Sequence, residues 1–84
     1  MVERTVTVAS AHGLHARPAS LFAQAAARAS APVTIAMGEK QVNAASVLSV
    51  ISLGVDKGDA VTIACDDESA LDELEQLLLT DHDA

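Results

Sequence analysis

Two stretches of this chain alternate between apolar and polar side chains, and this alternation limits the folds open to it. In residues 2–8, the valines share one parity while Glu3, Thr5 and Thr7 occupy the other. In residues 60–65, the inward parity holds Val61, Ile63 and Cys65. Successive side chains of a strand point to opposite faces. Each stretch therefore predicts a strand with one apolar and one more polar face.

Two shorter strands are predicted in the middle of the chain. Residues 32–37 read as one strand, with Val33 and Ile35 inward. Residues 37–40 form a turn in which Gly38 is free to take a positive φ. A short return strand over residues 41–43 follows.

Three helices separate or follow these strands. An alanine-rich helix is expected over residues 16–28, with Pro18 in its first turn. A short second helix should begin after an N-cap at Ser46, run through Leu53 and stop at Gly54. A third should begin near Ser69, because Ser69 and Asp72 have the spacing of a capping box. Its apolar stripe contains Leu71, Leu74, Leu77 and Leu78.

The predicted order is strand, helix, strand, strand, helix, strand, helix. Strands with one polar face fit an antiparallel sheet with one face in water and helices covering the other, which is an α+β fold. The length of 84 residues fits a single domain over residues 1–84. Half of the residues are apolar and the only aromatic residue is Phe22, so the core must be mainly aliphatic.

Composition narrows the possible partners and location. The net charge of −7 argues against nucleic acid, whose phosphates attract basic surfaces. We expect no signal peptide, because the N-terminus lacks a basic flank and a long apolar stretch. No apolar stretch approaches the ~20 residues that span a bilayer, so we expect no membrane insertion and a cytoplasmic location. The single Cys65 excludes an internal disulfide and is expected to be a buried strand residue.

His15 carries the strongest chemical signal, within the run Gly13-Leu14-His15-Ala16-Arg17-Pro18-Ala19. A neutral imidazole is a nucleophile near neutral pH, with an unperturbed pKa of ~6.5. The N–H groups of a starting helix favour an anion beside it, and Arg17 supplies a forked pair of donors. This arrangement suggests a phosphohistidine site.

The short second helix carries a separate signal. Its residues are apolar around most of its circumference, although one side suffices to cover a sheet. If Val50 and Leu53 face inward, Val47, Leu48 and Ile51 remain partly exposed and form a docking surface. Coverage of this cluster by a neighbouring loop or helix is the alternative.

These residues resemble those of the HPr family, the histidine-containing phosphocarriers of the bacterial sugar phosphotransferase system. The His15 run is similar to the family's phosphorylation motif, and residues 43–54 resemble its second signature around Ser46. The resemblance implies an open-faced sandwich, with a four-stranded antiparallel sheet and three helices on one face. It also implies that Nδ1 of His15 accepts a phosphoryl group from enzyme I, itself phosphorylated by phosphoenolpyruvate, and donates it to enzyme IIA domains.

Further expectations accompany that role. The backbone at Ala16 and Arg17 and the Arg17 side chain should contact the phosphate, and no cofactor is required. The chain would be a phosphorylated component rather than a stand-alone enzyme. Relay requires brief contacts, so we expect a monomer. The expected docking residues are Ser20, Gln24, Val47, Leu48 and Ile51.

Several alternatives remain open from the sequence. A regulatory module could use the same surface, with Ser46 phosphorylated by a kinase and recognised by a transcription regulator. A related nitrogen or dihydroxyacetone branch could use the same carrier chemistry. His12 lies three residues before His15, but a zinc site needs more ligands, so no metal is expected. His12 either influences His15 or is a loop residue, and His82 needs no function.

Overall fold

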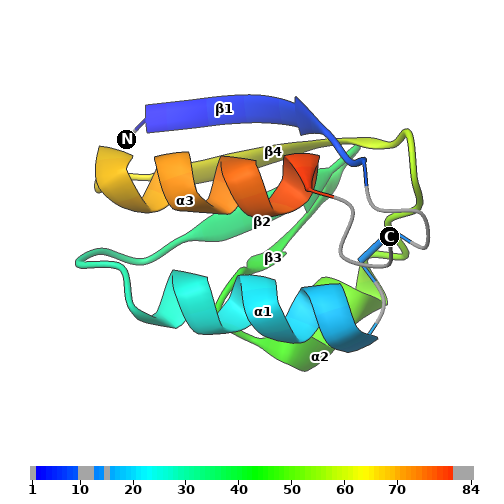
Figure 1. The fold of residues 1–84 in the computed structure, drawn as a ribbon, viewed down its shortest axis with the longest axis horizontal. Helices are drawn as coiled ribbons and strands as arrows, with labels where there is room; N and C mark the ends of the chain where they lie inside the picture. The colour runs from blue at the N-terminus through cyan, green and yellow to red at the C-terminus, as the bar shows by residue number, and fades with distance from the viewer. Residues whose placement is uncertain (1, 10–12, 15, 81–84) are drawn as a thin grey trace.

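The computed structural model describes residues 2–9, 13–14 and 16–80. The element order is the expected one, with four strands and three helices (Figure 1). The strands are β1 (Val2–Thr7), β2 (Thr34–Met37), β3 (Lys40–Asn43) and β4 (Ala60–Cys65). The helices are α1 (Ala16–Ala27), α2 (Val47–Ser52) and α3 (Glu68–Leu79).

The four strands form one antiparallel sheet in the order β1-β4-β2-β3. The two central strands, β4 and β2, place Ile63 opposite Ile35, and both side chains are fully buried. On the helices, the core includes Phe22 of α1, Val50 of α2, and Leu74 of α3. The inward side chains of β1, β2 and β4 therefore form one side of the core, with Val42 of β3 packed against it, and the helices cover a single face of the sheet (Figure 1).

The other face of the sheet is polar and carries few charges. Thr5 and Thr62 stand opposite each other on β1 and β4, and their hydroxyl oxygens are 3.1 Å apart. On the other half of the sheet, Gln41 of β3 donates to the Thr34 hydroxyl of β2 at 3.1 Å. These pairs confirm the predicted antiparallel sheet with one face in water.

The third helix begins near Ser69 as predicted, but its N-cap was predicted wrongly. The helix begins at Glu68 and its N-cap is Asp67, not Ser69. The Asp67 carboxylate accepts from the backbone N–H groups of Ser69 at 3.1 Å and Ala70 at 3.3 Å. Both residue types are good caps. Asp67 also makes a tertiary contact, because its carboxylate accepts from the N–H and hydroxyl of Ser30, at 3.1 and 2.9 Å.

Other boundaries shift by one or two residues. The strand predicted from Pro32 begins at Thr34, and α1 ends at Ala27. Pro32 has no N–H to donate to a ladder. Val33 is buried as expected, and its carbonyl accepts from Ala44 at 3.0 Å. Within the part of the chain that the structure describes, no helix has the length and apolar character of a membrane span.

Candidate phosphoryl-transfer site

The predicted site lies at the start of α1. His15 itself falls outside the described residues, as do His12 and His82, so the site is built here from its neighbours. Ala16 begins the helix and is exposed, as is Arg17. Pro18 and Ala19 are buried and fix this first turn against the core. The N–H groups of a first helical turn have no carbonyl to pair with inside the helix. They and Arg17 are thus available to an anion at this end of α1.

The approach to α1 is tightly packed. Gly13 has a φ of 68°, and a β-carbon placed there would lie 2.1 Å from the carbonyl oxygen of Val55. The side chain of Leu14 is buried, and its backbone N–H donates to the same Val55 oxygen at 3.0 Å. No role for Val55 was predicted from the sequence, because Val55 lies 42 positions from Gly13 and its side chain has no reactive group.

The residues expected to dock partners come from α1 and α2, which pack against each other. Ser20 is half-buried and Gln24 is exposed, and Gln24 donates to the Ser20 hydroxyl at 3.3 Å. Leu48 is 80% exposed and Ile51 is 37% exposed, whereas Val47 packs partly against the core. The inward and outward sides of α2 match the prediction, since Val50 and Leu53 are buried.

An exposed apolar residue of α1 was missed. Leu21 of α1 is 39% exposed and directly precedes the fully buried Phe22. Its signal was available in the sequence, because Leu21 falls outside the helical stripe formed by Ala19, Phe22 and Ala26.

Ser46 has the structural role that the sequence predicted. It is the N-cap of α2, and its hydroxyl accepts from the N–H of Ser49 at 3.3 Å. The side chain is half-buried, one position from Val47 and two from the exposed Leu48. A modification of this hydroxyl would therefore change both a helix cap and the edge of the apolar surface.

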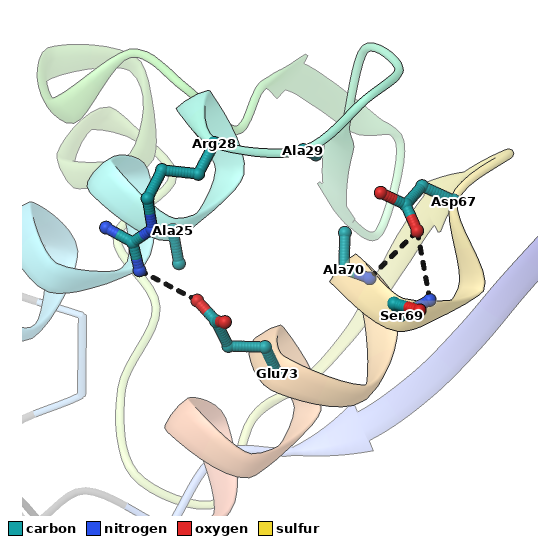
Figure 2. Close-up of a pocket in the computed structure, with 7 residues that line it drawn as sticks. All are labelled: Ala25, Arg28, Ala29, Asp67, Ser69, Ala70 and Glu73. Atoms are coloured by element: carbon teal, nitrogen blue, oxygen red, sulfur yellow. Dashed lines mark hydrogen bonds and ion pairs between the residues drawn. The ribbon is translucent and has the colours of Figure 1, made fainter.

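A cavity of about 190 Å³ lies at the other end of α1, between that end and the start of α3 (Figure 2). It is bridged by the ion pair between Arg28 and Glu73, 2.8 Å long. Hydrogen bonds from Ser30, and then from Ala70 and Ser69, hold the pKa of Asp67 below its usual range. A 12-residue helix separates this cavity from the start of α1 by about 18 Å. The cavity is therefore no part of the predicted site.

The remaining sequence candidates show structural roles. Cys65 is fully buried, and its sulfur lies 3.5 Å from the carbonyl oxygen of Ala31 and 3.3 Å from the N–H nitrogen of Asp67. Among the described residues, no three histidine, cysteine or carboxylate side chains gather as metal ligands would.

Known proteins match this chain over nearly its whole length. The family model described as "PTS HPr component phosphorylation site" matches residues 2–79. "Phosphocarrier protein HPr" of Streptomyces coelicolor is 50% identical over 78 residues, covering 92% of this chain and 84% of the relative. The protein of the same name from Haloferax volcanii is 44% identical over 84 residues, covering 94% of each chain. The crystal structure of HPr-C-His from Thermoanaerobacter tengcongensis superposes with a TM-score of 0.88 at 38% identity, covering 93% and 91% of the two chains.

Two further similarities extend the comparison. "HPr-like protein Crh" of Bacillus subtilis is 40% identical over 77 residues, covering 92% of this chain and 91% of that protein. A crystal structure of an HPr dimer from Thermoanaerobacter tengcongensis has a TM-score of 0.70 at 39% identity, covering 92% of each chain.

Proposed function

We propose, from the premise that this chain belongs to the HPr phosphocarrier family, that it relays a phosphoryl group between proteins through His15. In this proposal, enzyme I is the donor and enzyme IIA domains are the acceptors. The observation that carries the proposal is the family match across residues 2–79, which includes the His15 run, together with a helix that begins at Ala16.

The transfer is a simple exchange of one bond. The lone pair of Nδ1 on neutral His15 attacks phosphorus while the bond between phosphorus and enzyme I breaks, so the phosphoryl group moves without a cofactor. The new bond between Nδ1 and phosphorus later breaks as a nucleophile of an acceptor domain attacks phosphorus. Because phosphoryl transfer depends mostly on positioning and charge stabilisation, the partner supplies much of what the small carrier lacks.

The site holds the phosphoryl group weakly, which suits a relay. A helix N-terminus stabilises an exposed anion by about 0.3–1 kcal/mol. Arg17 adds a cation with two parallel donors, and its exposure leaves it free to contact phosphate or partner. A deep pocket with several cations would retain the group instead of passing it on.

The exposed apolar side chains Leu48 and Ile51, with Val47, Ser20 and Gln24, form the proposed docking surface. We propose that both enzyme I and the acceptor domains use it in turn, with the carrier acting as a monomer in the cytoplasm. Light scattering on the purified protein tests the oligomeric state, and a stable dimer would contradict the monomer.

The relay itself is tested by incubating the protein with phosphoenolpyruvate and enzyme I, and measuring its mass. The wild type should gain one phosphoryl group and His15→Ala should gain none. The chain has two other histidines, so His12→Ala and His82→Ala serve as matched controls that should still be labelled. Labelling of His15→Ala would rule the proposal out.

Regulation through Ser46 is a second candidate, favoured by the place of its hydroxyl at the cap of α2 beside the docking surface. A phosphate there would add negative charge next to Leu48 and hinder apolar docking. Incubation with a cognate serine kinase and mass analysis of wild type and Ser46→Ala tests this. Absence of a Ser46-dependent phosphate would remove the regulatory role.

A further inference from the structure

The turn of residues 56–59 forms backbone hydrogen bonds with Val8, the first residue after β1. The N–H of Gly58 donates to the carbonyl of Val8 at 2.9 Å, and the N–H of Val8 donates to the carbonyl of Asp59 at 2.9 Å. Val8 is fully buried and directly follows β1 by one position. This exchange of two hydrogen bonds fixes the start of the connection between β1 and α1.

The same stretch of chain also holds the end of that connection. Val55, which directly precedes the turn, accepts from the N–H of Leu14 at 3.0 Å. A β-carbon on Gly13 would meet not only Val55 but also the α-carbon of Asp56, at 2.7 Å. Val8 at the start of the connection and Gly13 and Leu14 at its end therefore rest on residues 55–59, while the N–H of Ala9 donates to the carbonyl of Leu78 in α3 at 3.0 Å. Helix α1 begins two positions after Leu14.

The turn is closed once through the backbone and once through a side chain. The N–H of Asp59 donates to the carbonyl of Asp56 at 3.0 Å, which closes the turn through the backbone. In the other direction, the N–H of Asp56 donates to Oδ2 of Asp59 at 2.9 Å. Without that carboxylate oxygen, the N–H of Asp56 loses its acceptor and the turn keeps only its backbone closure.

We infer that Asp59 is a positioning residue for phosphoryl transfer: its carboxylate closes the turn on which both ends of the segment leading to His15 are seated. This inference rests on the proposed function. Asp59 acts through the backbone of Val55 and Val8, not through contact with the phosphoryl group. Because small displacements of reacting groups strongly lower transfer rates, loss of this closure should affect the rate more than the fold.

The test compares Asp59→Ala with Asp59→Asn in the full chain. Asparagine keeps an oxygen acceptor at the same distance and removes the charge, whereas alanine removes both. Phosphorylation by enzyme I and phosphoenolpyruvate gives kcat and KM, and hydrogen exchange gives the protection of the Leu14 amide. Glu39→Ala removes an exposed acidic residue from the turn between β2 and β3 and controls for charge.

For Asp59→Ala we expect kcat about tenfold lower, KM unchanged and Leu14 exchange about tenfold faster. Asp59→Asn and Glu39→Ala should stay within about twofold of the wild type on all three measures. Wild-type kcat or wild-type Leu14 exchange in Asp59→Ala would overturn the inference, as would equal losses in the alanine and asparagine variants.

This design distinguishes a variant that fails to fold, and a failure of the proposed function, from a failure of the inference. If circular dichroism shows Asp59→Ala unfolded, Asp59→Glu replaces it, since one added methylene displaces the acceptor while keeping the charge; the same losses are expected. If the wild type accepts no phosphoryl group, the proposed function fails, and Leu14 exchange still decides whether Asp59 holds the segment.

Discussion

Gly13 and Val55 meet backbone to backbone, with no space between them for a side chain. Gly38 has nearly the same φ, 61° against 68°, but a β-carbon there would meet nothing within 4 Å. The two glycines therefore separate the effect of backbone conformation from that of close approach.

We expect Gly38→Ala to destabilise the protein by about 1–2 kcal/mol, the usual penalty of a left-handed residue. Gly13→Ala should cost more than that, because the backbone of Val55 and Asp56 must move away as well. Urea unfolding of both variants measures the difference. Equal losses of stability in the two variants would show that the close contact between Gly13 and Val55 does not contribute to stability.

Arg17 should matter for transfer and little for the fold. Because its side chain is exposed, Arg17→Ala should change the free energy of unfolding by no more than about 0.5 kcal/mol. The rate of phosphoryl transfer should fall about tenfold with the loss of a charged donor. Arg17→Lys should recover only part of this, since lysine lacks the fork.

Arg28 is the matched control for Arg17, because it lies just past the other end of α1 and pairs with Glu73. Transfer by Arg28→Ala should proceed at the wild-type rate in the same assay. A wild-type rate in Arg17→Ala would remove Arg17 from the mechanism.

Leu48 offers a test of docking without loss of stability. It is 80% exposed, so Leu48→Ser should leave the unfolding free energy within about 0.5 kcal/mol of wild type. The KM of enzyme I for this protein should rise about tenfold, which is the effect of losing one good interface contact. Leu79→Ser alters an exposed leucine at the end of α3 and should leave KM unchanged. A similar rise in both variants would argue against a docking surface centred on α2.

Asp67 should make stability depend on pH in the acid range. Its pKa is lowered in the folded state by hydrogen bonds from Ser30, Ala70 and Ser69, so folding favours the carboxylate. This contribution is complete above the unfolded pKa of about 3.9 and is lost as the pH falls through the lower folded value. Asp67→Asn should therefore lose less stability between about pH 5 and pH 2 than the wild type.

Urea unfolding at several pH values tests the Asp67 prediction, and Ser30→Ala should give an intermediate slope because it removes one of the donors. If the stability of Asp67→Asn fell with decreasing pH as steeply as that of the wild type, carboxylates other than Asp67 would cause the loss of stability.

Local signals predicted the elements well, and contacts between distant residues account for what was missed. The cap at Ser46 and the stop at Gly54 lie within one short segment, so the limits of α2 followed from the sequence. Ser69 and Asp67 are both suitable caps two positions apart, and the contact that accompanies Asp67 comes from Ser30, 37 positions away. Strand order has the same origin, since β1 pairs with β4 and not with its neighbour in sequence.

The candidate site divides in the same way. The reactive residues that we predict form one continuous run, and the prediction followed from their chemistry. Val55 and Asp59, which support the run, act through a backbone carbonyl and a turn, and no local pattern shows that this turn packs against residues 8, 13 and 14.

The aliphatic core has a practical consequence for watching this protein at work. Its lone aromatic side chain is the buried Phe22, and the chain has neither tryptophan nor tyrosine. It is therefore spectroscopically silent at the wavelengths that excite indole. In a mixture with a tryptophan-containing enzyme, every change in emission belongs to the other molecule, so encounter and release can be timed with neither protein carrying a dye.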